Sequence, residues 1–187
     1  MHYYKLIYDY ENDDKYINCN IGNIGDIDEY ATSKGAKINA WEDVTFQYNS
    51  TEGDVLSDYI SNVYRWLIVS GRFKELTEKL LCNQVQYLPV KLIDFVSKKV
   101  TNSFYVANII SVVDALDLEN SKYDIFELDD EKIISVQKYA IKRSKIKENH
   151  IFRLKDNTIP IFVSEKIKNI IEENGLSGFD FLEVDVI

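Results

Sequence analysis

The sequence predicts an α+β domain with a mainly antiparallel sheet and a few helices. Short segments typical of strands outnumber helical ones and do not alternate with them regularly, which favours an α+β over an α/β fold. A strand–helix–strand pattern also occurs twice, at about residues 66–92 and 160–187. With only seven Gly and two Pro among 187 residues, the chain is not typical of a disordered protein, and its length suits a single domain, residues 1–187, with a genuine core.

The two copies of this pattern have a constant offset. It is 94 residues from Ser70 to Ser164 (164 − 70), and it recurs in two further pairs, Val85 with Phe179 and Val90 with Val184. In each copy a short apolar strand leads to a serine, which we expect to cap the exposed amides at the start of a helix. The helix of about three turns is followed by a second strand.

The N-terminal third contains two predicted strands. Alternating side chains predict the first over Tyr3–Tyr10 and the second over Val44–Tyr48. Residues 18–40 have little periodicity and three glycines, so we expect an irregular segment with at most a short helix near Asp26–Thr32. Residues 55–66 fit either a helical turn or an extended arm.

The first copy predicts a helix whose apolar stripe is made of Phe73, Leu76, Leu80 and Leu81. The strand at Leu88–Leu92 contains Pro89, which has no amide hydrogen, so the strand should lie at an edge or contain a bulge there. The apolar run from Phe104 to Val113 is typical of a central strand that is covered on both faces.

The C-terminal half predicts two hairpins and a second helix. The hairpins pair residues 123–128 with 133–141, around a turn at 129–132, and residues 151–154 with 159–163. Residues 142–147 form a basic connector between them. The second helix has an apolar stripe of Ile167, Ile170 and Ile171, and Gly175 should end it in the left-handed conformation.

The charge is uneven along the chain. Of the net −9, residues 1–60 contribute −8, with four Lys/Arg against twelve Asp/Glu. This acidity favours a basic partner surface and argues against a nucleic-acid ligand, which requires a surplus of Lys and Arg. Without an apolar run long enough to cross a bilayer or a signal-peptide pattern, we expect a cytoplasmic protein that has no membrane partner. Cys19 and Cys82 are then expected to be reduced.

One acidic group could support catalysis. Asp114, Asp117 and Glu119 follow the apolar run and could hold Mg²⁺ in a metal-dependent hydrolase. Alternatively, Asp117 caps a turn and the other two carboxylates are solvated. The chain has no nucleophile elbow, zinc motif or phosphate-binding loop, and its two histidines, His2 and His150, lie in unrelated contexts. We therefore expect no enzyme, no resident metal and no cofactor.

Several motifs occur in an order that resembles a known family. They are Ile68–Ser70, Gln86–Val90, Tyr105–Ile109, Val113–Ser121, Ile151–Leu154, Ile161–Ser164 and Gly175–Phe179. Over about residues 66–187 the chain resembles the eleventh family of bacterial polymorphic-toxin immunity proteins, formerly a domain of unknown function. The resemblance implies a small cytosolic protein that binds and neutralises a toxin encoded by a neighbouring gene. Residues 1–60 would be a variable, partner-facing part.

The resemblance and the charge agree on a binding role. The carboxylates that we expect to face a basic toxin surface are Asp9, Glu11, Asp13, Asp14, Asp26, Asp28, Glu29, Asp114, Asp117 and Glu119. Charge would accelerate the encounter, and aromatic anchors would hold the complex. A self-assembling scaffold is a third possibility, which solution mass at several concentrations would distinguish; the sequence specifies no oligomeric state.

Overall fold

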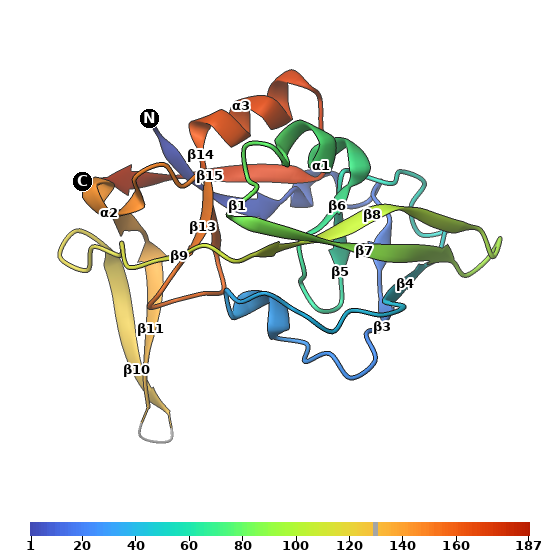
Figure 1. Cartoon of the computed structure of the whole chain (residues 1–187), viewed down its shortest axis with the longest axis horizontal. Helices are drawn as coiled ribbons and strands as arrows, with labels where there is room; N and C mark the ends of the chain where they lie inside the picture. The colour runs from blue at the N-terminus through green and yellow to red at the C-terminus, as the bar shows by residue number, and fades with distance from the viewer. Residues whose placement is uncertain (129–130) are drawn as a thin grey trace.

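The computed structural model describes residues 1–128 and 131–187, and it is mostly β with three short α-helices in that part of the chain (Figure 1). One sheet has seven strands in the order β2 (Asn18–Cys19), β5 (Tyr59–Asn62), β6 (Ile68–Ser70), β8 (Val100–Ile109), β7 (Val85–Asp94), β4 (Thr45–Tyr48) and β3 (Ile21–Asn23). The other has six, in the order β12 (Ala140–Ile141), β15 (Phe179–Val186), β1 (Tyr3–Tyr8), β14 (Ile161–Ser164), β13 (Ile151–Leu154) and β9 (Val112–Val113).

Both sheets are mixed, which differs from the single, mainly antiparallel sheet that the sequence predicts. Parallel pairs join β4 to β7, β2 to β5, β12 to β15 and β13 to β9. Three of these four pairs include a strand of only two residues. Segments so short leave almost no periodic signal, and their partners lie far away in the sequence.

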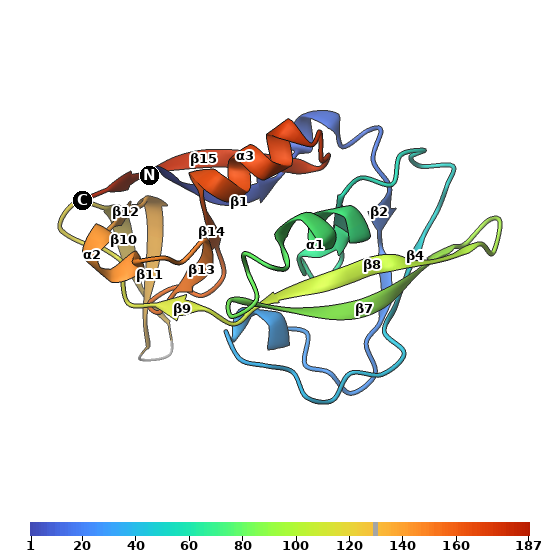
Figure 2. The ribbon, with the colours of Figure 1, turned by 45° about the horizontal axis from the view of Figure 1, so that its top comes forward.

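Each of the two related segments contains a strand, a helix and a second strand, in that order. The first contains β6, α1 (Gly71–Thr77) and β7, and the second contains β14, α3 (Glu165–Glu173) and β15. In each case a third, antiparallel strand lies between the two strands: β8 separates β6 from β7, and β1 separates β14 from β15. Figure 2 shows α3 along β1 and β15 and α1 beside β8.

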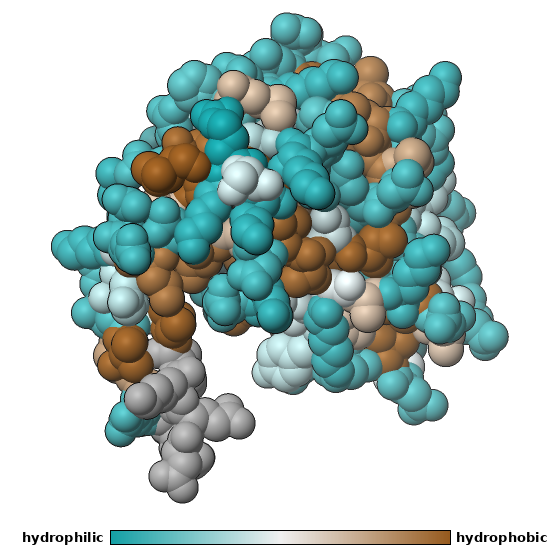
Figure 3. All heavy atoms as spheres, turned by 60° about the vertical axis from the view of Figure 1, so that its left-hand side comes forward, coloured by the Kyte–Doolittle hydropathy of each residue, from teal (hydrophilic) through white to brown (hydrophobic). Residues whose placement is uncertain are grey.

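A two-stranded arm extends from the body. It consists of β10 (Lys122–Leu128) and β11 (Glu131–Lys138), which confirms the first predicted hairpin, although Asp129 and Asp130 of its turn lie outside the described residues. Figure 3 shows hydrophobic residues on the arm, and Ile125 and Phe126 are each more than half exposed. The second predicted hairpin is also confirmed, as β13 and β14.

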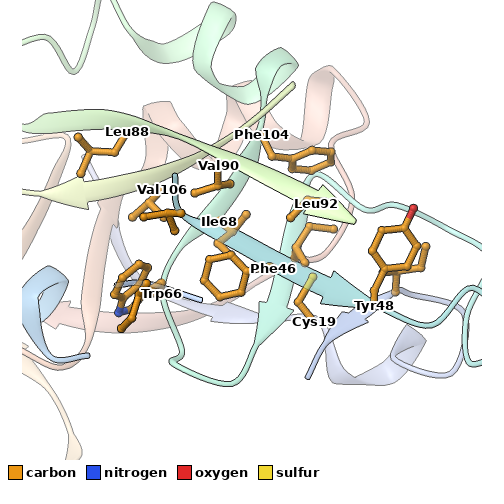
Figure 4. Close-up of a cluster of buried hydrophobic side chains, with 14 residues drawn as sticks. Cys19, Phe46, Tyr48, Trp66, Ile68, Leu88, Val90, Leu92, Phe104 and Val106 are labelled. Carbon is orange, nitrogen blue, oxygen red and sulfur yellow. The ribbon is translucent and has the colours of Figure 1, made fainter. Parts of the chain in front are cut away.

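The described part of the molecule has three apolar cores, one between the two sheets and one on the outer face of each sheet. Figure 4 shows the first, in which Phe46, Trp66 and Leu92 pack on the face of the seven-stranded sheet that residues 24–44 cover. The second lies between the sheets and includes both longer helices, through Phe73 of α1 and Ile167 of α3. The third lies on the far face of the six-stranded sheet, beside α2 (Arg143–Ile146). Each sheet is therefore apolar on both faces, as the unbroken run in β8 indicates.

Several local predictions are confirmed. β1 and β4 occur where alternation predicts them, and β8 is central between β6 and β7. The predicted central strand of Phe104–Val113 is confirmed only as far as Ile109, because Val112–Val113 form β9 at the edge of the other sheet. Gly175 has φ of +59° just after α3, where Ile167 and Ile171 are buried. β7 is an interior strand, but a register shift between Val90 and Leu92 follows Pro89 by one residue.

Other local predictions are wrong. Helix α1 has seven residues and ends at Thr77, so Leu80 and Leu81 of the predicted stripe lie beyond it, and Leu76 is 41% exposed. The basic connector contains the short helix α2. Residues 18–40 contain two short strands that the sequence does not predict, β2 and β3. The short helix expected near Asp26–Thr32 is a single turn of 3-10 helix, η2 (Ala31–Ser33), and another such turn, η1 (Tyr10–Asn12), precedes the region. Ser164 precedes α3, but its hydroxyl does not cap the helix because it bonds to the His150 imidazole at 2.9 Å.

Candidate functional site

The first predicted acidic group lies at the turn after β1. Asp9 caps η1, accepting hydrogen bonds from the Glu11 amide at 3.2 Å, the Asn12 side chain at 2.8 Å and the Tyr16 hydroxyl at 3.2 Å. Asp13 accepts a hydrogen bond from the Asn18 side chain at 3.1 Å. These two carboxylates organise the turn. Two exposed members of the group complete it, Glu11 and Asp14.

The second group lies between β3 and η2. Asp28 accepts a hydrogen bond from the Tyr30 amide at 2.8 Å and forms an ion pair with Lys34, which together lower the pKa of the Asp28 carboxyl. Glu29 is exposed, and its carbonyl accepts a 2.7 Å hydrogen bond from the indole of buried Trp66. That bond anchors this acidic segment to the core. Asp26 is exposed.

The third group, the predicted alternative for metal-dependent chemistry, is a turn. Asp117 is buried and accepts hydrogen bonds from the Asn120 side chain at 3.0 Å and the Glu119 amide at 3.1 Å. These bonds lower the pKa of its carboxyl. Asp114 is exposed, with Lys155 at 3.7 Å, and Glu119 is exposed. No group of three potential metal ligands occurs among the described residues. The carboxylate of Asp117 is thus occupied by its own turn.

The three groups occupy three different turns: after β1, between β3 and η2, and between β9 and β10. Within the described chain, no side-chain hydrogen bond or ion pair joins one group to another. The fold instead brings the second group beside carboxylates that the sequence reasoning did not select.

These additional carboxylates are Glu42 and Asp43, and together with Trp41 they line a groove with Asp26 and Asp28. The groove has a volume of about 650 Å³. Its apolar part includes Ile24, Ile27 and Ile38, which also pack on the first core. The sequence signal was the acidic pair directly after a tryptophan, but nothing local shows that it folds back towards Asp26.

Two side chains from the sheet hold the wall of this groove. The Gln86 side chain accepts a hydrogen bond from the Ile38 amide and donates one to the Ile38 carbonyl, both at 2.9 Å. Asn108 donates to the Ala36 carbonyl at 2.9 Å and to the Gln86 side-chain oxygen at 3.1 Å. These side-chain amide groups bond to the backbone of Ala36 and Ile38 as a neighbouring strand would, and so they fix this irregular segment against β7 and β8.

A second hollow, of about 720 Å³, lies where the arm meets the six-stranded sheet. Tyr139, Ile134 and Ile159 line it, and Ile159 is 78% exposed. Among the described residues that line it, the charged ones are one lysine and one aspartate, Lys5 and Asp156. The groove beside Trp41 differs because the charged residues that line it, in the described part of the chain, are all acidic.

Comparison with known proteins identifies the class. Residues 12–186 match the model of an immunity protein family, which covers nearly the whole chain. The chain belongs to this family, Imm11. The match begins well before residue 66 and so includes most of the acidic N-terminal third. A search of curated proteins finds no match. No helix in the described residues has both the length and the apolar character needed to cross a membrane.

Proposed function

We propose that this chain acts in the cytoplasm of the cell that makes it, where it binds a cognate toxin encoded by a neighbouring gene and neutralises it by protein–protein contact. The observation that carries this proposal is the family match over residues 12–186. Inhibition by contact, rather than by catalysis, is supported by the way Asp117 uses its carboxylate to close its own turn.

The acidic N-terminal third is the proposed toxin-facing part. It holds nearly all of the net negative charge, and its exposed carboxylates include Glu11, Asp14, Asp26 and Glu29. A negative surface accelerates encounter with a basic partner and disfavours wrong ones. The toxin would then lose activity because its active site is covered.

Co-expression tests this function. The toxin domain from the adjacent gene is produced with and without this chain, and survival is compared with that of cells that carry an unrelated immunity protein. We expect protection by this chain alone and co-purification of the two proteins at low salt. Failure of both protection and co-purification would overturn the proposal.

The molar ratio needed to inactivate the toxin distinguishes inhibition by contact from enzymatic destruction of the toxin. A protein that blocks its target protects only up to a fixed molar ratio, whereas an enzyme that destroys the toxin works at substoichiometric amounts. We expect toxin activity in vitro to fall linearly as this chain is added and to reach zero at a fixed ratio. Complete inactivation by a small fraction of that amount would contradict inhibition by contact.

A further inference from the structure

The groove beside Trp41 combines an apolar lining with a negative rim. Trp41 is partly buried, its ring lies 5.6 Å from that of Trp66, and its indole N–H donates to the Pro89 carbonyl at 2.8 Å. The indole donor is therefore already used. What Trp41 offers to a partner is the surface of its ring, which attracts cations and planar groups.

The charge on the rim is only partly balanced. Asp28 pairs with Lys34, and Asp43 pairs with Lys91 at 3.0 Å. The side chains of Asp26 and Glu42 have no ion pair or hydrogen bond among the residues that the structure describes. Two exposed carboxylates beside an aromatic ring thus lack a counter-ion within the described part of the chain.

From this charge complementarity we infer that the groove receives an arginine side chain from the toxin, with its guanidinium over Trp41 and paired with Asp26 or Glu42. Arginine suits the site better than lysine because its planar, weakly hydrated head both stacks on aromatic rings and forms two parallel bonds to a carboxylate. Apolar residues that flank the arginine would contact Ile27 and Ile38. This inference rests on the proposed function and names the chemistry of its partner.

The groove is formed before binding. Its wall is fixed by the Gln86 and Asn108 side chains, and the segment before η2 is anchored by Trp66. Little backbone has to become ordered when the arginine enters, and such preorganisation leaves more of the contact energy as affinity.

The test compares two double variants in binding to the purified toxin. Asp26→Asn with Glu42→Gln removes the unpaired charges of the groove. The control, Glu127→Gln with Glu173→Gln, removes two exposed charges elsewhere and so has the same net charge as the groove variant. We expect the groove variant to raise Kd by about tenfold or more. The change in Kd between about 50 mM and about 300 mM salt should also be smaller for this variant than for the wild type, because salt screens the charges at the rim. The control should bind like the wild type.

A peptide titration provides a readout that needs no toxin. The chain has two tryptophans, so ¹H–¹⁵N spectra contain two indole signals, which a Trp41→Phe variant assigns. Acetyl-Leu-Arg-Leu-amide should shift the Trp41 signal, while the same peptide with neutral citrulline should shift it far less.

The outcomes separate the two proposals. If wild type binds toxin but the groove variant matches the control, the groove inference is overturned and the function stands. If wild type binds no toxin, the proposed function fails, and the peptides then decide the groove: equal shifts with arginine and citrulline overturn it, and an arginine-specific shift supports it.

Discussion

The carboxylate of Asp58 accepts a 2.5 Å hydrogen bond from the Ser70 hydroxyl, and both residues are buried. The Ser70 oxygen in turn accepts a hydrogen bond from the Phe73 amide at 3.2 Å, which caps helix α1. The other Asp58 oxygen accepts from the Ser177 amide at 3.0 Å, in the turn before β15. One carboxylate therefore joins the first strand–helix–strand unit to the second.

Replacing this carboxylate should destabilise the fold. In Asp58→Asn, the amide group cannot accept at both positions, which leaves the buried Ser70 hydroxyl or the half-buried Ser177 amide without its acceptor. We expect a loss of about 2–4 kcal/mol in the free energy of unfolding. Urea denaturation followed by tryptophan fluorescence measures it. Exposed Asp54 supplies the matched control, Asp54→Asn, and equal midpoints for the two variants would refute the role given to Asp58.

The two serines at equivalent positions should respond differently to alanine. Ser70→Ala removes both a helix cap and a bond to a carboxylate, at a cost of about 2–3 kcal/mol. Ser164→Ala removes only the bond to His150, at a cost of about 1 kcal/mol. Unfolding free energies of the two variants are compared under one condition. An equal loss at both positions would show that Ser164 also supports its helix.

Two glycines near α3 provide a similar contrast. Gly178 has φ of +86°, and a Cβ there would lie 2.5 Å from the Tyr59 carbonyl oxygen. Gly175 has φ of +59° with open space around it. Gly175→Ala should cost about 1 kcal/mol, from backbone strain alone. Gly178→Ala adds a clash with backbone and should cost about 3 kcal/mol or more. Thermal unfolding of the two variants measures which substitution destabilises more. A smaller loss of stability for Gly178→Ala than for Gly175→Ala would contradict the prediction.

Asp94 should make the free energy of unfolding depend on pH. Its carboxylate accepts hydrogen bonds from the side chain and amide of Ser97, and from Val96 and Ser50, which hold its pKa well below the usual 3.8. Because the folded pKa is lowered, the stabilisation is fully present above the unfolded pKa and is lost as pH falls through the folded value.

Asp94→Asn removes this titration. We expect the free energy of unfolding of the variant to fall less steeply than that of the wild type between about pH 4 and about pH 2, as linkage requires. Urea titrations at a series of pH values measure both slopes. Parallel curves would mean that other carboxylates account for acid unfolding.

The two thiols should differ in reactivity. Both cysteines are free; Cys19 is buried in the first core, and burial raises its pKa to about 12, while Cys82 is exposed. Since the thiolate is the reactive form, the native protein should consume one equivalent of a thiol reagent rapidly and a second only in urea. Cys82→Ser should abolish the fast phase, and a fast phase that survives in this variant would contradict the burial of Cys19.

The sequence predicts elements well where one strong pattern acts alone. Alternation locates β1 and also β4, which buries every second side chain, and the apolar run locates the second half of β8, whose consecutive side chains are buried. It fails where distant groups compete. Ser164 has the right residue type for a cap, yet its hydroxyl bonds to His150, which directly precedes the neighbouring strand β13.

The candidate site is less predictable for the same reason. Composition directs the prediction to the acidic residues 1–60, and the structure places the predicted ones in separate turns. Glu42 and Asp43 lie beside Asp26 because Gln86 holds Ile38, 48 positions earlier in the chain. No local pattern contains that contact, since it depends on how residues 24–44 cover the sheet.

The position of β1 affects how the protein is made. This strand is synthesised well before its partners β14 (Ile161–Ser164) and β15 (Phe179–Val186), so its apolar side chains stay unpaired while the residues between them are translated. A chain whose synthesis stops before β14 would therefore lack both neighbours of β1 and could not complete the six-stranded sheet.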